Sequence, residues 1–439
     1  MLFRFKGGIH PDDKKTATRK KIIEELPAPK EVIIPMSMHI GAMCSPIVSV
    51  GEHVKLGQRI AESTVPVSSP IHASVSGIVT AIEPRPHPNG TEVLSVVIEN
   101  DFQDEPDDSI KPVDRFHTID AEELAEIVQE AGIVGLGGAA FPLHIKIKSA
   151  VGHVDTLIIN GAECEPYITA DNRMIIEYAE ELCDGASIVA RALGLNCATI
   201  AIESNKSRAI EELRRVIAKK TGVKLVVLHT KYPQGSEKQL IKAVTGREVP
   251  PGQLPSSVGV ININTSSAIA VSRALRHGTP LTTKVVTVSG SAVANPKNLL
   301  VRIGTPIREL FTACGDFKEA PYKVIMGGPM MGISQHTLDV PVIKATNAML
   351  AFSEDEEKPS GDGTCIHCGK CVGACPMHLM PLYIYSNSKL GRISECEKLN
   401  VTDCIECGCC SYICPARIHL VSAFRATKRR IADSKKKGE

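Results

Sequence analysis

The chain has 439 residues, a formal net charge of +1, and a composition of 43% hydrophobic and 23% charged residues, which is ordinary for folded globular protein. Its length exceeds what one compact core accommodates, so we expect several domains. It has no basic stripe interleaved with aromatic residues, no run of about 18 apolar residues and no apolar segment near the amino terminus, which argues against nucleic-acid binding, a membrane span and a cleaved signal peptide.

Residues 1–115 contain short Val- and Ile-rich runs separated by Gly, Pro and Ser, which predict small antiparallel strands. The phrases "VSVGEHVKLGQRIAE" and "SPIHASVSGIVTAI" resemble the two halves of a biotinyl- or lipoyl-type barrel-sandwich domain. The connection between them, "STVPVSSP", has no lysine at the expected hairpin tip, so the pattern favours a structural platform over a swinging-arm carrier. The stretch "ENDFQDEPDDSIKP" that follows is typical of an acidic linker.

Residues 116–280 alternate between helix-like and strand-like patterns. The strand-like stretches are "VDTLIIN", "CATIAIES" and "VKLVVLH", and the helix-like ones are "DNRMIIEYAEELCDGASIVARALG", "SRAIEELRRVIAKKTG" and "GSEKQLIKAVTG". This alternation predicts a parallel sheet covered by helices, with ligands at the carboxyl ends of the strands. Residues 281–350 predict strands with one short helix, a small α+β unit.

The stretch "GIVGLGGAAFPLHIKI" (132–147) is rich in glycine, and Gly135, Gly137 and Ala140 match the G-x-G-x-x-G/A pattern of dinucleotide sites. That pattern is meaningful only where a strand enters the loop. The preceding residues predict a helix instead, because three apolar residues recur at helical spacing: Leu124, Ile127 and Val128. The ordinary Rossmann interpretation therefore fails.

The glycines still suit a phosphate group. Gly135, Gly137 and Gly138 allow a backbone without Cβ atoms to approach a phosphate and to aim N–H groups at it, and Lys146 supplies a matching positive charge. Tight packing alone would also explain a glycine-rich turn, and Lys146 would then be a surface lysine.

Fifteen cysteines are present, and ten of them fall between Cys365 and Cys414. An odd total argues against a simple disulfide framework, so this block predicts thiolate metal ligands in a reducing compartment. The remaining cysteines, Cys44, Cys164, Cys183, Cys197 and Cys314, are scattered and are expected to be small buried residues.

The segments "CIHCGKCVGACP" and "CIECGCCSYICP" repeat the pattern C-x-x-C-x-x-C-x-x-x-C-P, which is typical of a two-cluster [4Fe–4S] ferredoxin. In that pattern the fourth cysteine of each run ligates the other cluster. The predicted ligand sets are Cys365, Cys368, Cys371 and Cys414 for one cluster, and Cys404, Cys407, Cys410 and Cys375 for the other. Two structural zinc sites are the alternative, but paired zinc ligands do not account for a third thiol and a C-P dipeptide, twice. Cys396 and Cys409 lie outside the pattern.

"GLGGAAFP", with Lys146 downstream, and "INGAECEPYITADNR" together resemble the flavin- and NADH-binding domain of the flavoprotein subunit of respiratory complex I. The whole order of domains is similar to the C subunits of the Rnf complex, a membrane-bound ferredoxin–NAD oxidoreductase. This resemblance implies a multidomain α/β protein. Its parts are a barrel-sandwich domain (1–115), a parallel-sheet FMN/NADH domain (116–280), a β-grasp domain around "VRIGTPIREL" (281–350), a ferredoxin-like helical domain with two clusters (351–425) and a charged tail (426–439).

The resemblance also implies roles for single residues. It assigns Gly135, Gly137, Gly138 and Lys146 to the FMN phosphate and ring site. Three further residues follow the strand "VDTLIIN" and have equivalents beside the flavin and the nicotinamide nucleotide: Asn160, Glu163 and Glu165. Further lining is expected from Gly235, Glu237, Asn262 and Thr265. The chain departs from the complex I pattern at Ala162 and Cys164, which agrees with the Rnf-type pattern.

The implied function is that of a peripheral enzyme subunit, exchanging a hydride between NAD(H) and FMN and single electrons with two [4Fe–4S] clusters, coupled to ion translocation by membrane subunits. FMN is expected to be non-covalent, because nothing resembles the threonine attachment motif of other Rnf subunits. The implied partners are the membrane and ferredoxin-like iron–sulfur subunits, NAD(H) and, indirectly, ferredoxin, at the cytoplasmic face of the membrane. The alternatives are a soluble flavin and iron–sulfur reductase of the cobalamin-reductase type, and a relay that keeps the clusters without flavin.

Overall fold

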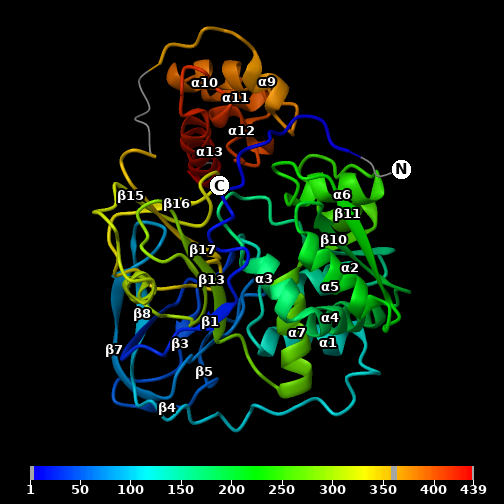
Figure 1. Cartoon of the computed structure of the whole chain (residues 1–439), viewed down its shortest axis with the longest axis vertical. Helices are drawn as coiled ribbons and strands as arrows, with labels where there is room; N and C mark the ends of the chain where they lie inside the picture. Colours follow the sequence, from blue (N-terminus) through cyan, green and yellow to red (C-terminus); the bar gives the residue numbers. More distant parts are fainter. Residues whose placement is uncertain (1–3, 357–362, 438–439) are drawn as a thin grey trace.

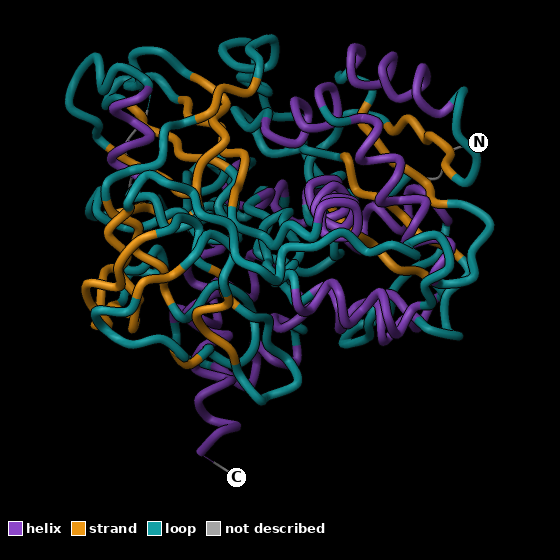
Figure 2. Tube along the Cα trace, turned by 90° about the horizontal axis from the view of Figure 1, so that it is seen from below, coloured by secondary structure: helices purple, strands orange, loops and turns teal. Residues whose placement is uncertain are grey.

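The computed structural model describes residues 4–356 and 363–437. In Figure 1 the β-rich parts lie on one side, a helix-covered sheet lies on the other, and the cysteine-rich helical region sits above both. Seen from below, α13 (Leu420–Lys437) projects from the body with the carboxyl terminus near its end (Figure 2).

The first part is built from two small antiparallel sheets, as the sequence predicts. The larger sheet has the order β2-β8-β7-β4, with bounds β2 (Glu31–Pro35), β4 (His53–Val54), β7 (Gly77–Pro86) and β8 (Glu92–Asn100). The smaller sheet contains β3 (Ser45–Pro46), β5 (Arg59–Glu62) and β6 (Ile71–His72). Alternate residues face the core, so Val79 is buried while its neighbour Ile78 is exposed.

The second part is a four-stranded sheet of order β11-β10-β9-β12 in which every ladder is parallel, so this prediction is confirmed. The strands are β9 (Thr156–Gly161), β10 (Ala198–Glu203), β11 (Val223–Leu228) and β12 (Val260–Asn264). The helices are α1 (Ala121–Glu130), α2 (Leu143–Ala150), α3 (Ala170–Glu177), α4 (Ala179–Ala192), α5 (Ser207–Ile217), α6 (Glu237–Thr245), α7 (Thr265–His277) and the short η1 (Pro255–Val258).

Local sequence explains these helices. Asp120 caps α1, because its carboxylate accepts the amides of Glu122 and Glu123 at 2.9 Å. α4 and α7 pack so closely that a Cβ atom on Gly185 would lie 1.9 Å from the Ala268 carbonyl oxygen. The expected helix before the glycine loop is α1, and the Rossmann interpretation is rejected on the structure as well.

The third part is a mixed six-stranded sheet of order β1-β14-β13-β17-β15-β16 with one helix, in agreement with the expected α+β unit. Its elements are β1 (Ile23–Glu25), β13 (Thr283–Ser289), β14 (Lys297–Arg302), α8 (Ile307–Ala313), β15 (Lys323–Met326), β16 (Ile333–Gln335) and β17 (Ala348–Phe352). β1 pairs in parallel with β14, so a strand from the expected barrel-sandwich range 1–115 completes this sheet.

The cysteine-rich part consists of short helices around a small apolar core. They are α9 (Lys370–Ala374), α10 (Pro381–Lys389), α11 (Ile393–Lys398), η2 (Val401–Asp403), α12 (Cys409–Tyr412) and α13. Residues 426–437 of the predicted charged tail instead continue α13, in which Ile431 is buried. The composition of the stretch "FSEDEEKPSGDG" is typical of a solvated linker, and its residues 357–362 lie outside the described residues. Among the helices that the structure describes, none is both long enough and apolar enough to cross a bilayer.

The buried ammonium group of Lys344 connects three parts of the molecule. Its Nζ donates to the carbonyl oxygens of Pro70, in the first part, and Gly132, after α1, both at 2.7 Å. Lys344 itself precedes β17 and is 1% exposed. Burial lowers the pKa of Lys344 to about 7.

This buried lysine makes stability depend on pH. The unfolded lysine has a pKa of about 10.4, so between about pH 7 and 10 the unfolded chain binds more protons than the folded chain, and folding stability rises with pH there. In Lys344→Met, the increase in the free energy of unfolding with pH should be smaller by up to about 1.4 kcal/mol per pH unit. Urea unfolding at pH 7, 8 and 9 measures this difference. The exposed Lys148→Met is the matched control. Parallel pH profiles for wild type and Lys344→Met would contradict this assignment.

Candidate functional site

Hydrogen bonds hold the glycine loop at Gly135 and Leu136, whereas the amides that follow are open to a ligand. The Gly135 amide donates to the Phe141 carbonyl at 2.8 Å, and the Leu136 amide donates to Ser267 Oγ at 2.9 Å. Buried Lys284 donates to the Leu136 carbonyl at 2.7 Å. Within residues 4–356 and 363–437, the amides of residues 137–139 donate no hydrogen bond, so they remain available to a ligand.

Two adjoining cavities of about 530 and 410 Å³ open beside this loop. They share six wall residues, namely Gly137, Gly138, Ala139, Asn160, Gly235 and Asn264. Both volumes lie within the range of about 300–1,000 Å³ that small-molecule and cofactor sites occupy. The glycine loop therefore forms the wall between two halves of one large site.

Two predicted acids, Glu163 and Glu165, lie on the wall of the larger cavity. Glu163 Oε1 accepts the Asp171 amide at 2.8 Å, while its Oε2 has no hydrogen-bond partner among the described residues. Burial, with Asp171 close by, raises the pKa of Glu163 to about 7. Burial likewise raises the pKa of Glu165 to about 7, and Glu165 Oε2 accepts the Met330 amide at 3.2 Å.

Two buried lysines hold the backbone beneath these acids. Lys15 Nζ donates to the carbonyls of Glu163 and Ile168 at 2.7 and 2.6 Å, and lies 3.6 Å from Glu163 Oε2. Lys206 Nζ donates to the same Glu163 carbonyl at 3.1 Å and pairs with Glu203 at 3.2 Å. Nothing in the local sequence pattern points to either lysine.

The smaller cavity contains the expected lysine. Lys146 Nζ donates to Glu237 Oε1 at 2.6 Å and to the Asn262 carbonyl at 3.2 Å, and all three residues line this cavity. The side-chain Oδ1 of Asn262 is buried and has no hydrogen-bond partner in the part of the chain that the structure describes. An unpaired acceptor, open amides and a lysine suit a polar ligand that carries phosphate.

The other predicted residues divide into two groups. Asn160 donates from Nδ2 to the Gly235 carbonyl at 2.9 Å, so both residues are brought to the shared wall. Thr265 is fully buried at the start of α7 and lines neither cavity, while its neighbour Asn264 lines both.

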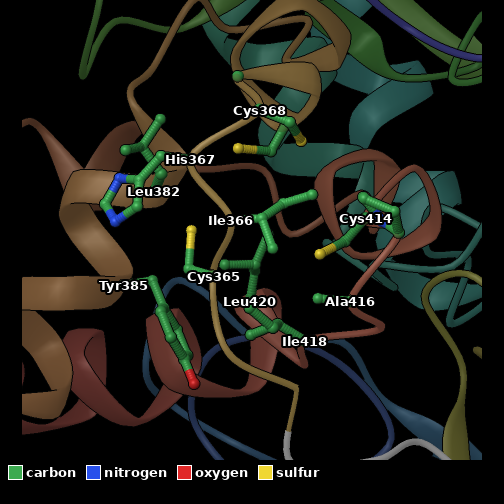
Figure 3. Close-up of a pocket in the computed structure, with 13 residues that line it drawn as sticks. Cys365, Ile366, His367, Cys368, Leu382, Tyr385, Cys414, Ala416, Ile418 and Leu420 are labelled. Atoms are coloured by element: carbon green, nitrogen blue, oxygen red, sulfur yellow. The ribbon is translucent and has the colours of Figure 1, made fainter.

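Each predicted cysteine quartet surrounds its own small cavity of about 20 Å³. One cavity is lined by Cys365, Cys368, Cys371 and Cys414, here named the Cys365 quartet. The other is lined by Cys375, Cys404, Cys407 and Cys410, here named the Cys375 quartet. Figure 3 shows the sulfur atoms of Cys365, Cys368 and Cys414 around one space. In both cavities the crossing cysteine lies with the three cysteines of the other run.

This arrangement favours clusters over zinc. Each quartet combines three cysteines of one run with the fourth cysteine of the other run, and paired zinc ligands do not require such a crossing. A [4Fe–4S] cube instead takes one thiolate at each corner, so its four ligands stand farther apart around a volume. The membership of the two quartets agrees with the two-cluster pattern.

The larger cavity beside the glycine loop adjoins the Cys375 quartet. Ile405 and Cys407, from the Cys375 quartet region, lie on the wall of the larger cavity. Between them and the parallel sheet stands Tyr232, whose hydroxyl donates to the Cys407 carbonyl at 2.8 Å. The Cys375 quartet is therefore the one next to the glycine-loop site.

Two further wall segments were missed from the sequence. The turn Gly327–Gly332, "GGPMMG", lies against Glu165 so tightly that a Cβ atom on Gly328 would be 2.2 Å from Glu165 Oε2. The tip of the β7–β8 hairpin, residues 87–89, contributes from the first part of the chain. The paired glycines could have drawn attention to the turn, whereas the hairpin tip carries no such signal.

Adjoining phosphate-type and thiolate-cluster sites define an electron-transfer protein of the flavin and iron–sulfur class, and comparisons with protein families agree. Residues 128–273 match the Nuo51 FMN-binding domain, residues 3–103 the RnfC barrel sandwich hybrid domain, residues 285–334 the SLBB domain and residues 364–418 the 4Fe-4S dicluster domain.

Full-length relatives are more specific. The chain is 47% identical to the C subunit of the Na(+)-translocating ferredoxin:NAD(+) oxidoreductase complex of Acetobacterium woodii, over 99% of this chain and 98% of that protein. It is 46% identical to the C subunit of the proton-translocating ferredoxin:NAD(+) oxidoreductase complex of Clostridium ljungdahlii, over 87% of this chain and 83% of that protein. It is 42% identical to the C subunit of an ion-translocating oxidoreductase complex of Rhodobacter capsulatus, over 98% of this chain and 84% of that protein. The chain belongs to this family, the C subunits of the Rnf-type ion-translocating oxidoreductase complexes.

Solved structures add a likeness of fold. The NAD+-reducing [NiFe]-hydrogenase superposes with a TM-score of 0.51 in its air-oxidised state, at 20% identity over 64% of this chain and 55% of that chain. Its H2-reduced state superposes with a TM-score of 0.50, over 72% of this chain and 65% of that chain.

The glycine loop makes a direct prediction about flavin. Gly138 has φ +134°, and a Cβ atom there would meet no protein atom within 4 Å, so it would project into ligand space. Gly138→Ala should lower FMN affinity at least tenfold, about 1.4 kcal/mol, measured by fluorescence titration of the deflavinated chain. Gly152→Ala, also at positive φ in open space but away from both cavities, is the control. Equal FMN affinity in both variants would contradict the role of this loop.

Proposed function

We propose that this chain is the NAD(H)-reacting subunit of an Rnf-type complex and binds one non-covalent FMN beside two [4Fe–4S] clusters. The observation that carries the proposal is that Cys407, a predicted cluster ligand, lies on the wall of the larger cavity beside the glycine loop. One continuous route thus joins a nucleotide-type site to a cluster site. The family match to an FMN-binding domain and a 4Fe-4S dicluster domain supports both cofactors.

When bound, FMN supplies the step between two-electron hydride exchange with NAD(H) and one-electron exchange with clusters. The residues of this chain bind and orient it. The open amides of residues 137–139 and the ammonium group of Lys146 would hold the phosphate, and the unpaired Oδ1 of Asn262 would accept a ligand N–H or O–H. The buried acids Glu163 and Glu165 would border the reacting part of the flavin.

The two quartets would serve in sequence. The Cys375 quartet adjoins the flavin cavity, and it would exchange electrons with the flavin first. The Cys365 quartet lies nearer the surface, where Cys368 is exposed and Ile366 beside it is 67% exposed. Exposed apolar residues around a redox centre suit a docking face for another electron carrier. We therefore propose that electrons pass between this chain and the iron–sulfur subunits at the Cys365 quartet.

The chain would act at the cytoplasmic face of the membrane through those partner subunits, which would perform the ion movement. Names of relatives specify different ions, Na(+) in Acetobacterium woodii and protons in Clostridium ljungdahlii. No observation favours a soluble cobalamin-reductase-type enzyme, and a preserved nucleotide-type cavity gives no support to a relay without flavin.

The assignment of two clusters and one flavin predicts the cofactor content of the chain. The wild-type chain, purified anaerobically, should contain about eight irons, about eight acid-labile sulfides and one releasable FMN, and NADH should bleach first the flavin and then the cluster absorbance. Cys375→Ser should lower the iron content to about four and stop electrons at the flavin, because it removes a ligand of the proximal centre.

Cys396→Ser is the matched control, since Cys396 is a buried thiol of the same domain outside both quartets. It should retain about eight irons. A wild-type chain with its full iron content but no FMN and no response to NADH would overturn the proposed function in favour of a cluster relay.

A further inference from the structure

A segment near the amino terminus, Gly7–Ile9, here named the strap, runs between the cysteine-rich part and the parallel-sheet part. In Figure 1 the dark blue trace passes below the orange and red helices on its way to the β-rich side. The Gly8 amide donates to the Ala374 carbonyl at 2.8 Å, directly before the quartet ligand Cys375. Ile9 and Tyr232 exchange two backbone hydrogen bonds, of 2.9 and 3.0 Å. The strap is thus bonded to both sides of the junction.

The strap fits only without side chains at its first two positions. Gly7 has φ +73°, and a Cβ atom there would lie 2.5 Å from the Cys375 carbonyl oxygen. Gly8 has φ +77°, and a Cβ atom there would lie 2.5 Å from the Tyr232 carbonyl oxygen. Because both the backbone conformation and the space exclude other residues, the contact is specific for glycine.

The third strap residue adds apolar contact. Ile9 is 5% exposed and packs in one cluster with Tyr232, Ala374, Cys407 and Cys409. Two members of that cluster, Tyr232 and Cys407, also line the larger cavity. The strap therefore lies directly behind the boundary between the flavin cavity and the Cys375 quartet.

Other contacts hold this boundary less completely. Gln239 Nε2, on α6, donates to the Pro376 carbonyl at 3.2 Å, and Arg425 donates to the Met331 carbonyl at 3.4 Å. Only the strap, among the segments that the structure describes here, bonds at once to the residue before Cys375 and to the backbone of Tyr232. Tyr232 in turn bonds to Cys407 through its hydroxyl.

We propose that the strap is a positioning element that fixes the Cys375 quartet against the flavin cavity and thereby sets the rate of electron passage between flavin and proximal cluster. The inference rests on the proposed function and adds to it a role for the amino-terminal segment. The strap touches neither cavity, so it does not act on hydride exchange.

The test uses the full chain with its cofactors and the variants Gly7→Ala and Gly8→Ala. In both, hydrogen–deuterium exchange of the strap and Tyr232 amides should speed up at least tenfold. FMN content and the rate of flavin bleaching by NADH should stay within twofold of wild type. The following reduction of the clusters, read by stopped-flow absorbance and freeze-quench EPR, should slow at least tenfold. Selective loss of the Cys375 quartet's iron would equally support the proposal.

Gly194→Ala is the matched control, because Gly194 has φ +71° like the strap glycines but a Cβ atom there meets nothing within 4 Å. It should match wild type in exchange and in both rates. Ile9→Ala, which removes apolar contact without backbone strain, serves if a glycine variant does not fold. It should also slow cluster reduction.

Wild-type rates of cluster reduction in strap variants whose amides exchange faster, or unchanged amide exchange in all three variants, would overturn the proposal. Failure of the proposed function would look different, since the wild-type chain itself would then lack FMN or fail to pass electrons to its clusters.

Discussion

The turn Gly161–Glu165, at the carboxyl end of β9, is the constraint on which the rest of the site depends. Lys15 and Lys206 donate to its Glu163 carbonyl from two sides, at 2.7 and 3.1 Å. A Cβ atom on Gly235 would lie 2.1 Å from another carbonyl of the same turn, so that chain segment packs against it with no side chain between them. Buried main-chain oxygens need such partners, because leaving them unpaired costs about 1–3 kcal/mol each. The amino-terminal segment, the start of α5 and the loop before α6 therefore all contact this one turn.

Iron–sulfur ligation by the proposed quartets would be coupled to folding in the cysteine-rich part. α9 and α12 span only Lys370–Ala374 and Cys409–Tyr412, far below the 12–15 residues or so at which an isolated helix becomes even marginally stable. Each quartet takes three cysteines from one run and one from the other, so a bound cluster ties both runs together. Binding free energy at such sites is folding free energy. As the proposed crossing ligands, Cys375 and Cys414 would thus contribute to the architecture as well as to the electron path.

Local spacing allowed the two cysteine runs, the single strands of the parallel sheet and the glycine loop to be predicted from the sequence, because each of these features lies within one short stretch. Long-range packing could not be predicted. Lys14 and Lys15 are adjacent and chemically identical, yet their side chains are 50% and 5% exposed, and only tertiary structure brings Lys15 to Glu163. Thr265 follows the end of a strand, where a ligand is expected, but it begins α7 and faces the interior. The periodicity of apolar residues predicts where a helix or strand lies in the chain, whereas packing against neighbouring elements determines which of its residues face the site.

The larger cavity is walled by segments from all four parts of the chain, including residues 87–89, the glycine loop, the turn Gly327–Gly332 and Cys407. A ligand that fills it binds only the assembled arrangement. Mass action then stabilises that arrangement by about 2.7 kcal/mol at a free ligand concentration about one hundred times Kd. Flavin binding is accordingly expected to order the domains as well as to supply the redox group. Because the same assembly also brings Cys407 of the Cys375 quartet to the cavity wall, the arrangement that would hold the flavin would also complete the proposed electron route.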